Sequence, residues 1–399
     1  MRYLVIFSLL LFSACQKKPF IPIYDTTADL TQQLDEIYQN GQLPGFAVAI
    51  VNEKEILFEK TVGYADIANK VPYTNNTQQN IASISKTFIG IALMQAVAQG
   101  KLSLDQPIND LLPFSVHNPN HPTLPITARH LATHTSSIND SEIGYKRVFL
   151  KTPYTLNAKE VGKEHHQFFE AWAKNTSSNL GDFLRSALTI DGVNYEKKRF
   201  SKDKPGQTYQ YSNLGASLLA YLIEIAVNQP FSDYVQQTIL RPLALSQTRW
   251  SSDTKSDQPQ ATTYFQDQQI VPQYENILYP AGGLYSTPHD LSQYLMALLK
   301  NNAGSEHLLS AAAFQEMISP QLTDLPPSEN RGIMWAINDQ QAGHNGGNYG
   351  VTLFFAFDKE KAYGRLFMTN ISSYKDRQLI PQMVEIWKLL EKEGDRLTP

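Results

Sequence analysis

The first residues whose types and spacing could do chemistry are Ser83 and Lys86, at the start of a long apolar stretch. Residues three apart on a helix share a face, so the lysine amine can reach the serine hydroxyl. A serine hydroxyl is a poor nucleophile until a base takes its proton. Lysine can be that base when burial or a neighbouring charge lowers its pKa. Free N–H groups at the start of a helix also favour a developing oxyanion.

The Ser-x-x-Lys pattern recurs in this chain and is not specific by itself. It occurs again at Ser201 with Lys204, at Ser252 with Lys255 and at Ser372 with Lys375. Ser83 differs because it opens a long apolar helix after two predicted strands, whereas two of the others lie in polar loops and the third follows a strand. A serine that only opens a helix would give the same pattern, so that alternative stays open.

A second candidate group is Tyr211 with Asn213, directly before a predicted helix. A phenol near a lysine can carry protons, and an amide can hold a substrate carbonyl or the lysine amine. Tyr-x-Asn also occurs at positions 38, 73 and 274, so the pattern is weak by itself. The alternative is a tyrosine that packs beside the start of a helix.

A third group is His344 with Gly346, and this His-x-Gly pattern occurs once in the chain. Gly346 and Gly347 precede a predicted strand and lack side chains, so the backbone of a ligand can approach closely. The alternative is a hairpin turn, because Asn-Gly is a strong short turn signal.

In this order and context, the three motifs resemble those of the serine β-lactamase and penicillin-binding protein superfamily. The most similar branch contains class C β-lactamases, D-alanyl-D-alanine carboxypeptidases and related esterases. Flanking segments at 43–49, 126–137 and 280–287 are also similar to that branch, so the resemblance covers most of the mature chain. One departure is Ser137, where the family usually has glycine; this position carries no catalytic role.

The resemblance implies a role for each motif residue. Ser83 would form the acyl-enzyme, and Lys86 and Tyr211 would exchange protons with Ser83, the leaving group and water. Which of these two is the base in each step stays open. The oxyanion hole would be the backbone N–H groups of Ser83 and Gly347. Three residues would contact the substrate: Asn213, His344 and Gly346. The mechanism needs no cofactor and no metal ion.

His344 bears on the type of substrate. β-Lactamases of this branch usually have lysine at this position, whereas histidine is only partly charged near neutral pH. Peptidases and esterases of the family more often carry histidine. The resemblance therefore favours a serine hydrolase acting on a peptide or ester, such as a D,D-peptidase on peptidoglycan stem peptides or an esterase. The alternatives are a true β-lactamase and an inactive envelope binding protein of the same fold.

The sequence gives little support for a metal site, an α/β-hydrolase site or a nucleic-acid-binding site. His130 and His134 have a metal-like spacing, but no glutamate follows in the zincin manner, and the family segment explains both as packing residues. His165 and His166 lie in a polar stretch and are expected to be solvated. The chain has no G-x-S-x-G elbow, which counts against an α/β-hydrolase. The net charge is −4 and the chain has no run of basic residues, so the sequence indicates no positively charged surface for binding nucleic acid.

The N-terminus has the features of a bacterial lipoprotein signal. A basic start and an apolar run too short to span a bilayer lead to small residues before Cys15, the one cysteine of the chain. We predict a signal peptide over 1–15, lipidation of Cys15 and a tether over 16–25. The protein would then be anchored in the cell envelope, facing the periplasm. The alternative is an ordinary secretory peptide, since Phe12 departs slightly from the usual pattern.

Elements at both ends of the chain must position these groups. Hydrophobic patterns predict strands at 45–51, 56–62, 332–338, 350–357 and 364–371, with helices at 26–39 and 377–393. The simplest α+β architecture is one antiparallel sheet built from both termini and covered by these helices. Helices at 85–99, 180–188, 214–227 and 291–299 predict a largely helical lobe. The sheet lobe would comprise 26–82 and 330–399, and the helical lobe 83–329. We interpret 139–205 as a decorated surface loop, with a substrate-shaping insertion as the alternative.

Overall fold

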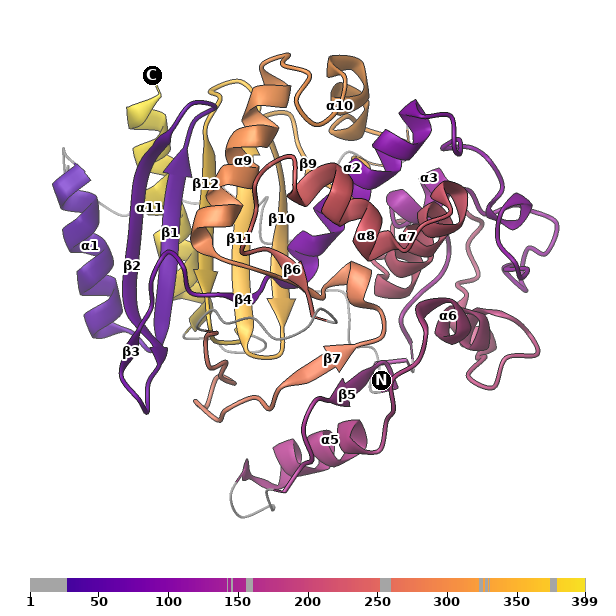
Figure 1. Ribbon diagram of the computed structural model, residues 1–399, viewed down its shortest axis with the longest axis horizontal. Helices are drawn as coiled ribbons and strands as arrows, with labels where there is room; N and C mark the ends of the chain where they lie inside the picture. Colours follow the sequence, from indigo (N-terminus) through magenta and orange to yellow (C-terminus); the bar gives the residue numbers. More distant parts are fainter. Residues whose placement is uncertain are drawn as a thin grey trace.

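The computed structural model describes residues 27–141, 143–144, 146–155, 161–251, 260–322, 326, 329, 331–373 and 379–398. Its largest sheet has seven strands in the order β3-β2-β1-β12-β11-β10-β9, and all neighbours are antiparallel. The pairing of β1 with β12 joins the two ends of the chain (Figure 1). The predicted α+β fold with one antiparallel sheet built from both termini is confirmed. The strands are β1 (Gly45–Val51), β2 (Ile56–Asp66), β3 (Val71–Pro72), β9 (Ala336–Ile337), β10 (Gln341–Asn348), β11 (Val351–Asp358) and β12 (Gly364–Thr369).

Strand β1 is buried on both faces, which explains its unbroken apolar sequence. Phe46 and Val48 pack with the terminal helices α1 (Thr27–Asn40) and α11 (Leu379–Leu397), which cover one face of the sheet (Figure 1). Ala47 and Ala49 belong to the core on the opposite face, where α9 (Pro288–Asn302) lies against β1 and β12. The small alanine side chains let α9 approach the sheet closely. The structure thus places α9, from the predicted helical lobe, on the sheet.

The second lobe is built around α2 (Ser85–Ala98), which is almost entirely buried and packs against α7 (Asn213–Val227). Because its hydrophobic cluster continues into the sheet, the two lobes share one core. The remaining helices and turns are α3 (Ala128–Ala132), α5 (Lys163–Ala173), α6 (Leu180–Leu188), α8 (Phe231–Val235), α10 (Ala311–Met317), η1 (Ala82–Ile84), η2 (Ile108–Asp110), η3 (Lys197–Arg199), η4 (Gln236–Leu240) and η5 (Tyr279–Ala281). Two small sheets consist of β4 (Gln79–Asn80), β8 (Leu284–Ser286) and β6 (Arg249–Trp250), and of β5 (Val148–Leu150) and β7 (Tyr274–Asn276).

The sequence prediction is wrong around the third motif. The strand predicted at 332–338 is reduced to β9, and an unpredicted strand, β10, carries His344 and Gly346. Three glycines and several polar residues give β10 a low intrinsic strand propensity. Its pairing with β11 over eight residue pairs overrides that propensity. The hairpin turn falls later, at Gly350, whose φ is +79°.

The segment at 139–205 is not a surface loop. Its β5 pairs with β7, and α5 buries Phe169 and Trp172 in a separate aromatic cluster that also contacts Tyr349, just after β10. His165 and His166 are only partly exposed, so the expectation that both are solvated is wrong. His165 stacks on Phe265 with ring centroids 4.4 Å apart, as part of the same cluster. This insertion therefore packs beside the third motif.

The predicted signal peptide, Cys15 and the tether lie outside the described residues, and lipidation stays a prediction. Among the helices the structure describes, no single one is long and apolar enough to cross a membrane. Residues 213–227 and 231–240 meet that criterion only as a pair, with a bend of 79° between them. Residues 214–220 of α7 are buried in the protein core.

Candidate active site

The turn that carries Ser83 is strained and fixed by hydrogen bonds. Ser83 lies in η1, directly before α2, and is half-buried. Its neighbour Ala82 has a φ of +48°, in the left-handed region that costs energy for a residue with a Cβ. Asn80 Oδ1 accepts from Ala82 N at 3.0 Å, and Ser85 Oγ donates to Ala82 O at 2.7 Å. These bonds hold Ser83 in place at the start of α2.

The structure brings Ser83, Lys86 and Tyr211 together. Lys86 Nζ lies 3.1 Å from Ser83 Oγ, as expected for positions one helical turn apart. The Tyr211 hydroxyl, from the segment before α7, donates to the same Ser83 Oγ at 2.8 Å. A hydroxyl in contact with both an amine and a phenol meets the geometric requirement for an activated nucleophile.

Burial sets the protonation of the lysine. The Lys86 side chain is fully buried, with Nζ 2.8 Å from Asn213 Oδ1 and also bonded to the carbonyl of Ala281. Desolvation lowers the pKa of Lys86 well below its usual value. The negative charge of Asp140 opposes this shift, and the positive charge of Arg147 adds to it. Because the desolvation effect is the largest, a neutral amine is favoured far below the usual pKa of lysine.

Burial has the opposite consequence for the tyrosine. It raises the pKa of Tyr211, while the hydrogen bond to Ser83 lowers it by a smaller amount. The phenol therefore stays protonated at neutral pH and acts as a hydrogen-bond donor. Its ring packs on His134, with centroids 4.6 Å apart, which limits its rotation.

Asp140 was missed by the sequence analysis, although it organises the Tyr211 region. Its carboxylate accepts from Asn213 Nδ2 at 2.7 Å, from the backbone N of Asn213 at 2.9 Å and from that of Leu214 at 2.9 Å. It also accepts from Ser212 Oγ at 2.9 Å. Because the amide nitrogen of Asn213 faces Asp140, its amide oxygen faces Lys86. Asp140 lies 73 positions before Asn213, and no motif connects the two.

Replacing Asp140 with alanine is expected to lower the free energy of unfolding by at least about 2 kcal/mol, because it leaves charge-assisted hydrogen bonds at the start of α7 unmade. Asn213 would also lose its fixed orientation, so turnover should fall. Urea denaturation with parallel activity assays would measure both effects. Asp182→Ala, at an exposed carboxylate in α6, is the control. Equal stability of both variants would show that Asp140 does not organise this region.

The third motif lies beside the nucleophile turn, and its two glycines are needed for different reasons. Strand β10 packs against η1. A Cβ on Gly346 would lie 2.8 Å from the carbonyl oxygen of Ile81, so a side chain there would displace the strand from the turn. A Cβ on Gly347 would meet nothing within 4 Å. Gly347 is exposed and adjoins open space, as a ligand-facing position requires.

The surroundings of His344 favour its neutral form. Burial lowers its pKa to about 3, helped by the charges of Lys86 and Arg331 and opposed by a bond to the Asn345 carbonyl. Nδ1 lies 2.7 Å from that carbonyl oxygen, which can only accept, so Nδ1 carries the proton. The sequence alone does not show this burial or the neighbouring cations, both of which favour the neutral imidazole.

Arg331 was also missed by the sequence analysis. Its guanidinium lies 4.4 Å from the ring centre of Tyr209, and the residue is 7% exposed. The ring of Tyr209 lies 6.1 Å from that of His134, which packs on Tyr211, so Arg331 is on the Tyr211 side of the site. Its positive charge lowers the pKa of both His134 and His344. Arg331 is thus a permanent positive charge on this side of the site, whereas burial disfavours a charged His344.

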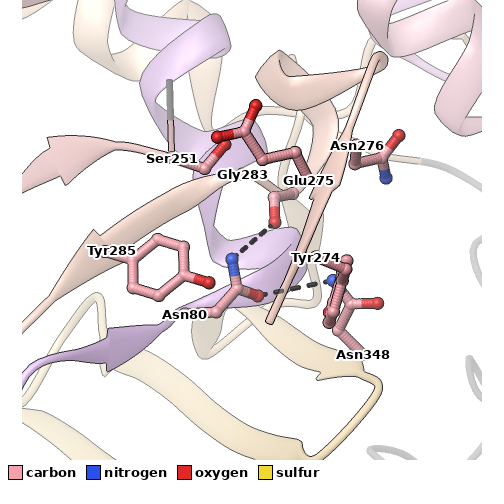
Figure 2. A pocket seen from close by; sticks show the side chains of 9 residues that line it. Asn80, Ser251, Tyr274, Glu275, Asn276, Gly283, Tyr285 and Asn348 are labelled. Carbon is pink, nitrogen blue, oxygen red and sulfur yellow. Dashed lines mark hydrogen bonds between the residues drawn. The ribbon is translucent and has the colours of Figure 1, made fainter. Parts of the chain in front are cut away.

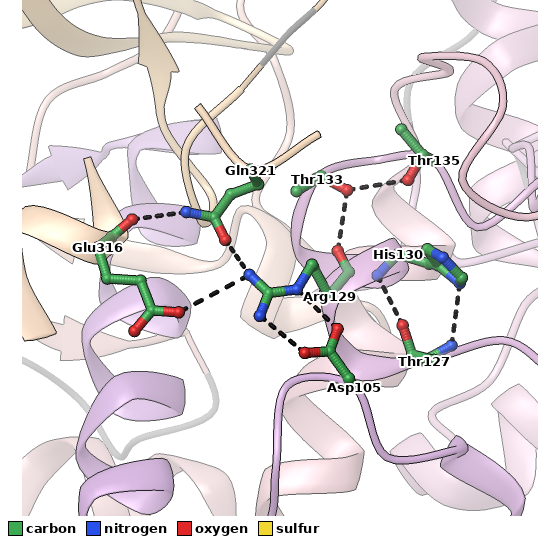
Figure 3. A network of polar contacts seen from close by, with 8 residues as sticks. All are labelled: Asp105, Thr127, Arg129, His130, Thr133, Thr135, Glu316 and Gln321. Carbon is green, nitrogen blue, oxygen red and sulfur yellow. Dashed lines mark hydrogen bonds and ion pairs between the residues drawn. The ribbon is translucent and has the colours of Figure 1, made fainter. Parts of the chain in front are cut away.

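His130 and His134 have packing and capping roles. His130 closes the N-terminal cap of α3, because its Nδ1 accepts from Thr127 N at 3.2 Å and its own N donates to Thr127 Oγ1 at 3.2 Å (Figure 3). Next to this cap, Arg129 connects α3 to Asp105 and to Glu316 of α10 (Figure 3). Within the described residues, no group of His, Cys, Asp or Glu side chains could hold a metal ion.

Comparison with known proteins gives a consistent result. A family model described as Beta-lactamase matches residues 28–383. Protein flp of Staphylococcus aureus (strain N315) is 23% identical over 369 residues, which cover 90% of this chain and 66% of that protein. The chain thus spans slightly less than two thirds of the length of this relative.

Solved structures share the fold. The octameric penicillin-binding protein homologue from Pyrococcus abyssi has a TM-score of 0.68 and 23% identity, covering 91% of this chain and 77% of its own. The penicillin binding protein from Bacillus halodurans has a TM-score of 0.64 and 24% identity, covering 89% of this chain and 98% of its own. The predicted β-lactamase/transpeptidase-like fold is confirmed.

Proposed function

The chain belongs to the beta-lactamase family, whose members are serine hydrolases, and from this premise we propose that it hydrolyses a peptide or ester through an acyl-enzyme on Ser83. The observation that carries the proposal is the contact of one hydroxyl, Ser83 Oγ, with both Lys86 Nζ and the Tyr211 hydroxyl. A binding protein has no use for such an arrangement.

Lys86 is suited to be the base that activates Ser83. A neutral amine has two N–H groups and one lone pair. The amide oxygen of Asn213 and the carbonyl of Ala281 take the two N–H groups, so the lone pair is left for the Ser83 hydroxyl. Since Tyr211 donates to the same oxygen, the proton of Ser83 can move to Lys86 while Oγ attacks the substrate carbonyl.

Tyr211 is suited to be the acid. As the tetrahedral intermediate collapses, the bond to the leaving group breaks and the leaving atom takes the proton of the phenol; the ammonium of Lys86 then restores a proton to the site. The backbone N–H groups of Ser83 and Gly347 would bind the oxyanion. Water reverses these transfers when it attacks the acyl-enzyme and releases the acid.

Arg331 favours a leaving group that carries a carboxylate, as in a D,D-peptidase. Its guanidinium lies over the ring of Tyr209, which adjoins His134, and His134 packs on Tyr211, so Arg331 is on the side of the proposed proton donor. Neutral His344 cannot provide this charge, and Nε2, its unprotonated nitrogen, cannot donate a hydrogen bond. A guanidinium binds a carboxylate through two parallel hydrogen bonds.

The substrate is tested with an acylated D-Ala-D-Ala dipeptide, its carboxamide-capped analogue, a penicillin and a short-chain ester. The kcat/KM for the dipeptide with a free carboxylate should be about 10- to 100-fold higher than that for the carboxamide-capped dipeptide. This factor corresponds to the free energy of a charge-assisted hydrogen bond. Arg331→Gln should remove this preference, chiefly through KM, and Arg331→Lys should restore part of it. Equal losses on both peptides would contradict carboxylate recognition, and faster turnover of the ester or the penicillin would favour an esterase or a β-lactamase.

A further inference from the structure

The strand that carries one half of the proposed oxyanion hole ends in a tight turn. Asn348 of β10 pairs with Val351 of β11, so Tyr349 and Gly350 form a two-residue hairpin loop. Gly347, whose N–H group is one of the proposed donors, lies two positions before Tyr349. Two strand residues span about 7 Å, so a displacement of the turn also moves Gly347.

This end of β10 has little support from the large sheet itself. Within the described residues, β9 pairs with β10 only at Ala342 and Gly343, at the opposite end of the strand. Gly346 and Gly347 have no side chains that pack, and glycine leaves the backbone free to adopt other conformations. The position of Gly347 therefore depends on the contacts that hold the turn beyond it.

Aromatic rings from the inserted segment surround the side chain of that turn. The ring centre of Tyr349 lies 4.9 Å from that of Phe168 and 4.6 Å from that of Trp172, both in α5. The ring of Tyr274 in β7 is 5.7 Å away. All three pairs are edge-to-face, with interplanar angles of 71°, 66° and 84°, which is a favourable geometry for aromatic rings.

The second residue of the turn is held by another segment of the same cluster. A Cβ on Gly350 would lie 2.5 Å from the Cβ of Thr263, so the backbone of the turn is in direct contact with the segment at 263–271. Phe265 and Val271 of this segment belong to the aromatic cluster that contains α5. Both residues of the turn are thus packed against parts of the chain outside the large sheet.

A hydrogen-bonded path joins the turn to the nucleophile. Asn348 Oδ1 accepts from Tyr349 N at 3.0 Å, and Asn348 Nδ2 donates to Asn80 Oδ1 at 3.4 Å. Asn80 Oδ1 also accepts from Ala82 N, directly before Ser83. Figure 2 shows Asn80 and Asn348 joined in this way at the edge of a small pocket that both line. The two halves of the proposed oxyanion hole are therefore connected through Asn348.

We propose that the inserted segment positions the oxyanion hole, with Phe168 and Trp172 as positioning residues that hold Tyr349 and, through it, the N–H group of Gly347. The inference rests on the proposed acyl transfer at Ser83 and deepens it. Donors stabilise an oxyanion only where its charge develops, so their placement affects the chemical step. If the aromatic cluster served stability alone, its loss would lower the melting temperature and leave kcat of the folded protein unchanged.

Substitutions of Tyr349 test the proposal with para-nitrophenyl butyrate as the substrate. Tyr349→Ala should lower kcat about 10- to 100-fold and leave KM within about twofold, because a misplacement of about 1 Å costs up to about 100-fold in rate. Tyr349→Phe keeps the ring and should retain a kcat close to that of the wild type. Phe168→Ala, which changes α5 itself, should lower kcat in the same direction.

Inhibition by phenylboronic acid reports on the oxyanion hole directly. The Ser83 oxygen bonds to boron and its proton passes to the Lys86 amine, while the boronate keeps both hydroxyl groups and carries the negative charge. This adduct resembles the tetrahedral intermediate, so its inhibition constant in Tyr349→Ala should rise by about the same factor by which kcat falls. Melting curves of each variant, with assays well below the melting temperature, separate this effect from unfolding.

Phe114→Ala is the matched control, because Phe114 is also partly exposed and its ring lies 6.0 Å from that of Tyr221 in the helical lobe. It should keep the wild-type kcat and inhibition constant. Wild-type values of both in Phe168→Ala, or an equal loss in Phe114→Ala, would overturn the positioning role, even if Tyr349→Ala did not fold. Absence of Ser83-dependent hydrolysis in the wild type would instead overturn the proposed function.

Discussion

Replacing Ser83 with alanine is expected to lower kcat by at least about 10⁴-fold on any substrate that the enzyme hydrolyses, since removal of the nucleophile of a serine hydrolase costs up to about 10⁶-fold. Lys86 and Tyr211 would remain in place but would have no hydroxyl to activate. Labelling by a fluorophosphonate or penicillin probe should also disappear, which intact-protein mass spectrometry would show as the loss of the covalent adduct.

The fold should tolerate this change, because Ser83 is half-buried and alanine can adopt the same backbone conformation as serine. Loss of its side-chain hydrogen bonds should cost about 1 kcal/mol of unfolding free energy. Ser201→Ala is the matched control, since Ser201 belongs to the same Ser-x-x-Lys pattern but lies in the loop before Lys204. The Ser201→Ala variant should be labelled by the probe and should hydrolyse substrate as the wild type does. Undiminished turnover in Ser83→Ala would refute the assignment of the nucleophile.

The sequence predicts the side chains that meet at Ser83 by two routes, a local helix pattern for Lys86 and the family resemblance for Tyr211. Lys86 reaches Ser83 through helix geometry alone, as expected for a separation of three. Tyr211 reaches it from a distant segment, and its placement was inferred from the resemblance rather than from periodicity. Strand β1 was predicted with its observed bounds, since its unbroken apolar run suits a strand buried on both faces.

The residues that tune the site could not be predicted in this way. Asp140, Arg147 and Arg331 are single charged residues outside any motif, and their importance depends on contacts made only in the folded chain. Strand β10 was missed because its glycines and polar residues carry a turn signal, whereas its formation depends on pairing with β11. The helix pattern and the resemblance thus predicted the residues that meet at Ser83, whereas their protonation depends on tertiary contacts.

Replacing Lys86 with arginine is expected to lower kcat about 10²- to 10⁴-fold, the usual contribution of a general base, even though the positive charge is retained. A guanidinium cannot lose its proton in a protein, so it cannot accept the proton of Ser83. Lys86→Met, which fits a buried site without a charge, should lose as much. Pre-steady-state acylation by a chromogenic ester would show that the loss falls on the chemical step.

The pH dependence gives a second test of the same residue. An unperturbed lysine is neutral in about 1 molecule in 2,500 at pH 7, too few for an efficient base. Since burial lowers the pKa of Lys86 well below 10.5, kcat/KM should rise with pH as the amine loses its proton, with a midpoint far below that value. Tyr211 has a raised pKa and stays protonated over this range, so it cannot produce the rise. A Lys86→Met variant within tenfold of the wild-type rate, with the same pH profile, would show that another group takes the proton of Ser83.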